Sequence, residues 1–190
     1  VRAVAAHPQV NARFDDEAGV LTQHEAVHLG VATQTDGGLM VPVLRQAQAL
    51  DLWQTSTTIA RLAAAARAGK ATREDLTGST ITITSLGKIG GIVTTPVINR
   101  PEVAIVGVNR IVARPAVRDG VICVRQTMNL SSSFDHRVVD GAVAAQFIQQ
   151  VPYAVRLLEA MRIPILQYDG YEADDVIATL SCAALKHGVD

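Results

Sequence analysis

The chain has 190 residues, of which 48% are hydrophobic and 18% are charged, so it is long enough for one domain and a modest appendage. Its 17 Lys and Arg nearly balance its 18 Asp and Glu, and a net charge of −1 gives no electrostatic basis for binding nucleic acid. No apolar run approaches the ~18 residues of a membrane span, and no signal-peptide pattern is present. Cys123 and Cys182 have no metal-binding spacing, and we expect a reducing, cytoplasmic setting.

The first half of the chain alternates predicted strands with one clear helix. The pattern predicts, in chain order, the end of a helix over 1–6, a turn-rich segment over 11–20, strands over 27–33 and 39–44, and a helix over 52–68. Asp51 is positioned to cap that helix. His24 and His28 are four residues apart, but they lie in a predicted loop and strand, so their spacing does not indicate a metal site on a helix.

The second half predicts a mixed set of strands followed by a helix. The expected elements are strands over 79–85 and 103–108 separated by a glycine loop, a hairpin of 111–117 and 121–128, an extension of its second arm over 129–134, and a helix over 140–150. Asp140 lies near the N-cap of that helix. Because the residue before a proline disfavours helical geometry, we expect the helix to break or bend at Val151-Pro152.

The most informative segment, SSSFDHRVVDGA over 131–142, joins the last predicted strand to this helix. It places His136 between Asp135 and Asp140. A histidine in such a position is suited to general-base catalysis near neutral pH. The His-x-x-x-Asp spacing is common on its own, and a lone histidine in a loop is more often a surface group, so the wider context decides between the two.

The whole segment resembles the Asp-His-x-x-x-Asp-Gly signature of the dihydrolipoamide acyltransferases, the core subunits of the 2-oxoacid dehydrogenase complexes. The resemblance extends over 1–150 in the family's order, through HPQVN (7–11), GLMVPV (38–43), TITSLG (82–87), GG (90–91) and TPVINRPEVAI (95–105). It implies an α/β, chloramphenicol-acetyltransferase-like, coenzyme A-dependent acyltransferase fold with a mixed sheet and packed helices. It also implies that the first part of the catalytic domain precedes Val1, so the fold would be truncated here.

The family's chemistry is acyl exchange between dihydrolipoamide and coenzyme A, and the resemblance assigns roles to four residues. A thiol with a pKa near 8.5 is mostly protonated at pH 7, and His136 matches the family's base. Thr84 falls where the family has the hydroxyl that stabilises the oxyanion, with Ser85 beside it as the alternative. Asp140 matches the family's second acid, which would hold the loop. The plainer alternatives are that Asp140 is only a helix cap and Thr84 only a β-branched strand residue.

The resemblance also implies partners. In the family, the base and the hydroxyl come from neighbouring subunits of a trimer, and trimers assemble into hollow cubic or icosahedral cores. We therefore expect a homotrimer within a larger homo-oligomeric core, working with lipoyl domains and the other components of the 2-oxoacid dehydrogenase complex. No lipoyl module is visible in this sequence.

Residues 151–190 resemble a different family, the 5′-nuclease domain of bacterial DNA polymerase I, through GYEADDVIATL over 170–180. Glu172, Asp174 and Asp175 match that family's metal ligands, which would hold Mg²⁺ if the tail were a functional nuclease. The alternative is that acids in the first turn of a helix stabilise its dipole. About forty residues cannot build a stable core alone.

Three functions remain open on these grounds. The first is an acyltransferase catalytic domain over 1–150 that carries a short α/β, nuclease-like fragment over 151–190. The second is a DNA-metabolism protein, against which the near-neutral charge argues. The third is a non-catalytic assembly fragment. The sequence does not indicate which acyl group an acyltransferase of this kind would carry.

Overall fold

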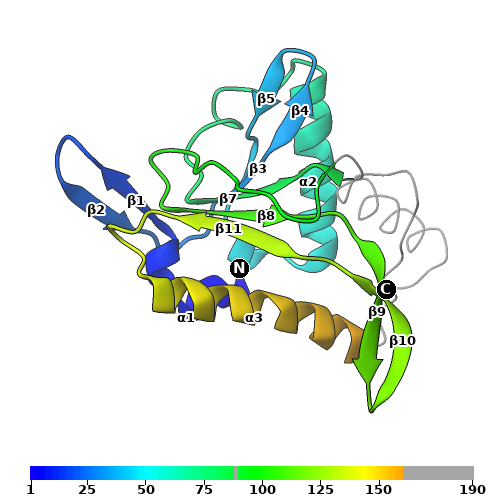
Figure 1. Ribbon diagram of the computed structural model, residues 1–190. Coiled ribbons are helices and arrows are strands. Elements are labelled where there is room, and N and C mark those ends of the chain that lie inside the picture. The colour runs from blue at the N-terminus through cyan, green and yellow to red at the C-terminus, as the bar shows by residue number, and fades with distance from the viewer. Residues whose placement is uncertain (88–89, 161–190) are drawn as a thin grey trace.

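A mixed β-sheet forms the centre of the computed structural model, which describes residues 1–87 and 90–160 (Figure 1). Within those residues, five strands pair in the order β11-β8-β7-β3-β6, namely Leu130–Phe134, Ala104–Val108, Ile81–Ser85, Leu29–Val31 and Val43–Leu44. The strand β7 is parallel to both β3 and β8, whereas β11 and β6 are antiparallel to their neighbours. The expected mixed sheet is therefore present.

Three two-stranded hairpins accompany this sheet in the described part of the chain. They are β1 with β2 (Ala12–Asp15, Val20–Gln23), β4 with β5 (Thr33–Thr35, Gly38–Met40) and β9 with β10 (Val112–Arg118, Val121–Thr127). The turn-rich segment predicted over 11–20 contains a turn over 16–19, but this turn joins the two strands of the first hairpin, which were not predicted. Each long strand predicted over 27–33 and 39–44 is divided in two, since the chain leaves the main sheet to form the second hairpin.

The helix α2, Leu52–Arg67, begins and packs as the sequence predicts. The Gln54 amide donates to Asp51 Oδ1 at 2.7 Å and the Asp51 amide donates to Gln54 Oε1 at 3.1 Å, which is a complete capping box. Its buried face carries small and aliphatic residues, Ser56, Ile59, Leu62, Ala63 and Ala66, and it packs against β4 and β6. The predicted role of Asp51 is confirmed.

The helix α3, Gly141–Ala160, lies beside α1, Arg2–Ala6, and contacts the edge strand β11 (Figure 1). The Val143 amide donates to Asp140 Oδ1 at 2.9 Å, so Asp140 caps this helix as predicted. The helix runs through Pro152, and the end predicted near residue 150 was wrong. A proline removes one helical hydrogen bond, and here that loss does not end the helix. No described helix is long and apolar enough to cross a membrane.

The hydrophobic core lies between the sheet and these helices. Val103, Val139 and Leu44 are almost fully buried, and Phe147 of α3 meets the Phe134 ring edge-on with centroids 6.0 Å apart. This packing fixes α3 against β11. It therefore also fixes the short turn that joins them.

The hairpin β9–β10 projects from the body of the molecule (Figure 1). Its register pairs Ile122 with Val117 and Val124 with Pro115, so the outer part of one face is apolar, with Gln126 beside Ala113 nearer the body. The three aliphatic side chains of that face are 74–76% exposed. Cys123, on the other face, is half-buried and its thiol contacts the Ala116 carbonyl at 3.5 Å. The prediction that 129–134 extends this hairpin was wrong, because β11 instead pairs with β8 in the main sheet.

Candidate active site

His136 lies in the turn between β11 and α3, and its side chain is exposed. The Asp135 amide donates to the Val103 carbonyl at 2.8 Å, which ties the start of the turn to the sheet. The Asp135 carbonyl accepts from the amides of Val138 and Val139 at 3.0 and 2.9 Å, which closes the turn. Val139 is 1% exposed and anchors the far side in the core.

Arg137, the next residue, makes most of the side-chain contacts around this turn. Its Nε and Nη2 donate to the two carboxylate oxygens of Asp135 at 2.9 and 2.6 Å. Its Nη1 also donates to Asp16, in the turn of the first hairpin, and its guanidinium lies 4.4 Å from the Phe14 ring centroid. These bonds lower the pKa of Asp135 and raise that of Arg137. Sequence reasoning missed Asp16, which carries no motif.

Thr84 and Ser85 lie at the carboxyl end of β7 and are half-buried. Ser85 Oγ accepts from the Gly87 amide at 3.3 Å, so its hydroxyl supports the following turn. The loop after β7 exposes several large apolar side chains, Leu86, Ile92, Val93 and Val97. It also packs tightly on β8, since a Cβ on Gly107 would lie 3.0 Å from Thr94 Oγ1.

The sheet register separates Thr84 from His136. Thr84 lies opposite Gly107, which lies opposite Ser131, whereas β11 continues three residues further to Phe134. That offset is roughly 10 Å along the strands and roughly 10 Å across them, and His136 follows beyond it. Within one chain, the two predicted catalytic residues therefore lie at opposite ends of the sheet.

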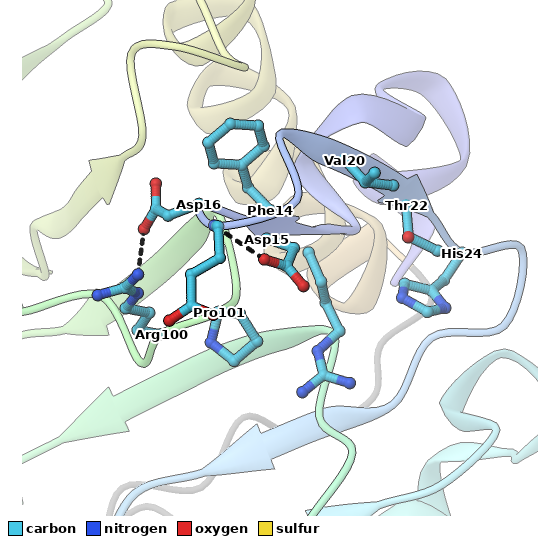
Figure 2. A pocket seen from close by; sticks show the side chains of 10 residues that line it. Phe14, Asp15, Asp16, Val20, Thr22, His24, Arg100 and Pro101 are labelled. Atoms are coloured by element: carbon cyan, nitrogen blue, oxygen red, sulfur yellow. Dashed lines mark hydrogen bonds and ion pairs between the residues drawn. The ribbon is translucent and has the colours of Figure 1, made fainter.

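Two surface hollows share the ion pair Arg100–Asp16 in their linings. Figure 2 presents the first, of about 470 Å³, with Phe14, Asp16, His24 and Arg100 around it. The second, of about 410 Å³, includes Ser133, Asp135, Arg137 and Glu102 in its lining.

Glu102, behind the second hollow, is 3% exposed. Its Oε1 accepts from Ser79 Oγ, Thr82 Oγ1 and Asn99 Nδ2 at 2.5, 2.9 and 2.8 Å. Burial nevertheless raises its pKa, because the charged form is poorly solvated there. Burial likewise lowers the pKa of His24 and of His28. No group of three His, Cys, Asp or Glu suited to a metal ion occurs among the described residues.

A mixed sheet flanked by helices, with an exposed histidine in the turn from an edge strand to a long helix, is the arrangement that the sequence resemblance predicts. The chain matches the family described as 2-oxoacid dehydrogenases acyltransferase (catalytic domain) over residues 1–163. It belongs to this family, and the predicted fold is confirmed.

Relatives in the family are named as enzymes. The chain is 67% identical over 151 residues to the lipoamide acyltransferase component of the branched-chain alpha-keto acid dehydrogenase complex of Pseudomonas aeruginosa, covering 80% of this chain and 35% of that protein. It thus spans about a third of the length of the curated relatives that it matches.

Solved structures give the same fold. The dihydrolipoamide acetyltransferase of Azotobacter vinelandii is 37% identical with a TM-score of 0.76, over 84% of this chain and 66% of that one. In the catalytic mechanism of that enzyme, roles have been investigated for a serine, a histidine 52 positions later and an asparagine four positions after the histidine. The cubic core of a pyruvate dehydrogenase multienzyme complex matches with the same identity, TM-score and coverage.

The predicted metal ligands of the tail, Glu172, Asp174 and Asp175, lie outside the described residues. The family match ends at residue 163 and therefore does not reach them. The nuclease-like fragment and its Mg²⁺ remain predictions from the sequence.

Proposed function

We propose that this chain is part of a lipoamide acyltransferase that moves an acyl group between dihydrolipoamide and coenzyme A within a 2-oxoacid dehydrogenase complex. The observation that carries the proposal is the family match over 1–163, together with the histidine turn. The 67% identity to a branched-chain component over 151 residues, against 42% to an acetyltransferase component over the same length, favours a branched-chain acyl group.

In this proposal His136 is the general base. It takes the proton from the attacking thiol, and the thiolate adds to the thioester carbonyl. Thr84 donates a hydrogen bond to the oxyanion that forms. The tetrahedral intermediate then expels the second thiolate, to which His136 returns the proton. The bonds broken and formed are equivalent, so the same groups serve both directions.

The spacing of these residues supports their roles. Thr84 precedes His136 by 52 positions and Asp140 follows it by four, as in the serine, histidine and asparagine of the Azotobacter enzyme. The substitutions keep the chemistry, because threonine retains the hydroxyl and aspartate retains an oxygen that can cap a helix. Asp140 would position the turn through that cap.

We further propose that each active site is shared between two copies of the chain, in a homotrimer that builds a larger core. The separation of Thr84 from His136 supports this, because within one chain the two side chains are too far apart to act on the same thioester group. The apolar face of β9–β10 and the apolar loop after Thr84 would be covered by the neighbouring copies. Lipoyl domains and the other components of the complex would be the further partners.

Mixing two inactive variants tests this proposal. His136→Ala and Thr84→Ala chains would each form trimers without acyl transfer to coenzyme A. Random mixed trimers should recover about a quarter of the wild-type rate, because one site in four pairs an intact His136 with an intact Thr84. The assay is acyl-CoA formation from an acylated dihydrolipoamide after co-refolding. No recovery would contradict the shared site, and an active His136→Ala trimer would contradict the base.

A further inference from the structure

The two neighbours of His136 in the chain carry the side chains that fix its turn. Arg137 meets Asp135 in a bidentate pair, through Nε at 2.9 Å and Nη2 at 2.6 Å. The Arg137 amide also donates to Asp135 Oδ1 at 3.1 Å. The backbone on both sides of His136 is thus joined by three hydrogen bonds to one carboxylate. Such planar, charge-assisted pairs restrict geometry more strongly than single hydrogen bonds do.

The same guanidinium reaches a separate part of the molecule. Its third nitrogen donates to Asp16, 121 positions earlier in the sequence, and its face covers the Phe14 ring. The hairpin that carries Asp16 is itself ordered, because Asp15 Oδ1 accepts from the amides of Glu17 and Ala18 at 3.0 Å each. The histidine turn is therefore attached to a firm support outside its own element.

These ion pairs contribute little to overall stability, since Arg137 is 57% exposed and exposed pairs are screened by water. Their effect lies in geometry. A catalytic base that is displaced by about 1 Å loses on the order of a hundredfold in rate. A turn whose central residue has an exposed side chain gains precision from contacts made by its neighbours.

We propose that Arg137 is a positioning residue for His136, acting through a clamp formed by Asp135, Arg137 and Asp16. The proposal rests on the proposed role of His136 as the base. It goes beyond that role by assigning a task to Arg137 and to Asp16, neither of which touches the reacting atoms. Because the clamp positions the base and does not bind substrate, its loss should reduce kcat and leave KM for both thiols nearly unchanged.

The central variant is Arg137→Ala, measured in the assembled protein with acyl-CoA and dihydrolipoamide as substrates. We expect kcat to fall about 10- to 100-fold, with each KM within about threefold of wild type. Arg137→Lys keeps the charge without the planar fork and should recover only part of the rate. Asp16→Asn removes one of the two carboxylates and should cost less than Arg137→Ala.

Arg100 provides the matched control, because it pairs with the same Asp16 and is 72% exposed. Arg100→Ala should change kcat by less than about threefold. Methylguanidinium supplies a second readout, since it can refill the planar site. Added at concentrations that leave the fold intact, it should raise kcat of Arg137→Ala several-fold and leave kcat of Arg100→Ala unchanged.

The outcomes distinguish a failure of the clamp from a failure of the proposed role of His136 as the base. An unchanged kcat in Arg137→Ala, a loss expressed mainly in KM, an equal loss in Arg100→Ala, or no response to methylguanidinium would each overturn the clamp. If Arg137→Ala does not fold, Arg137→Lys and Asp16→Asn carry the same kcat and KM test. A His136→Ala protein that remains active would overturn the proposed base, whereas an inactive one beside a fully active Arg137→Ala would overturn the clamp alone.

Discussion

The two ends of the central sheet differ in how completely one chain builds them. At the His136 end, the turn is hydrogen-bonded to Val103 just before β8 and is followed directly by the capped start of α3. It is also packed through Val139 and joined through Arg137 to the first hairpin. At the Thr84 end, β7 runs into a loop with exposed apolar side chains, beyond which the hairpin β9–β10 projects with an uncovered apolar face. One end is built from contacts within the chain, and the other leaves apolar side chains exposed.

This difference suggests why the proposed site would take its base from one end of the sheet and its hydroxyl donor from the other. The base requires an exact tautomer and orientation, so it lies where local contacts are dense. The hydroxyl donor lies at the surface that a second copy would cover, so substrates would react only where two chains meet. Removing water from that junction would also strengthen the hydrogen bond to the oxyanion.

A charge on the apolar face of β9–β10 should have the largest effect, because it acts on every site at once. Ile122→Asp would bury an unpaired carboxylate at the proposed interface. We expect the solution mass to fall to that of a monomer and acyl transfer to drop about a hundredfold or more. Light scattering after size-exclusion chromatography measures the mass. Leu39→Asp, on the exposed β4–β5 hairpin, is the control that should leave both unchanged.

At the Thr84 end itself, substitution should affect rate without affecting assembly. Thr84→Ala removes the proposed oxyanion donor and should lower kcat about 10²- to 10³-fold, whereas Thr84→Ser should retain most activity. Ser85→Ala is the matched control, because that hydroxyl supports the turn at Gly87. Steady-state kinetics on assembled protein decide the matter. A greater loss in Ser85→Ala than in Thr84→Ala would transfer the role to Ser85.

At the His136 end, Asp140 allows capping to be separated from charge. Asp140→Ala removes the bond to the Val143 amide and should lower the free energy of unfolding by about 1 kcal/mol. Asp140→Asn can keep that bond and should leave both stability and kcat close to wild type. Urea unfolding and acyl-transfer assays test the pair. A large loss of activity in Asp140→Asn would mean that the carboxylate charge itself is required.

Glu102 lies at the His136 end, where it bonds Thr82 of β7 and lines the hollow beside Arg137. Because burial raises its pKa, the folded protein holds the Glu102 proton more tightly than the unfolded chain does. Its contribution to stability is complete below the ordinary glutamate pKa and is lost as the pH rises through the raised value. Relative to Glu102→Gln, the wild type should therefore lose stability as the pH rises. Urea unfolding of both proteins, from below the ordinary glutamate pKa to above the raised one, measures this difference in the free energy of unfolding. A difference that does not change with pH would contradict the prediction.

Local patterns in the sequence account for the elements that were predicted well. The helix α2 has its cap at Asp51 and its apolar residues at helical spacing. The hairpin β9–β10 has Asp119-Gly120 at its turn, both with positive φ. The first hairpin was missed because β1 has only four residues and β2, VLTQ, is exposed throughout and lacks the alternation of a half-buried strand. The strand β11 was assigned to the wrong neighbour because pairing with β8 is a long-range choice.

In the candidate site too, some residues could be predicted from local sequence patterns and others could not. His136, Thr84 and Asp140 could be named because a family signature marks them in the sequence. The clamp could not, since Arg137 and Asp16 are 121 positions apart and carry no shared motif. The separation of Thr84 from His136 also follows only from strand register. Local patterns identify which groups are present, and tertiary pairing decides which of them meet.

The projecting hairpin also contains a cysteine that could carry a fluorescent label for following assembly. Cys123 lies on β10 between Ile122 and Val124, and its thiol is half-buried in the single chain. With Cys182 replaced by serine, a maleimide dye would react at this position alone. Because Cys123 lies on the face opposite Ile122 and Val124, the dye would leave the proposed interface clear, and the rise in its fluorescence anisotropy would follow assembly in real time.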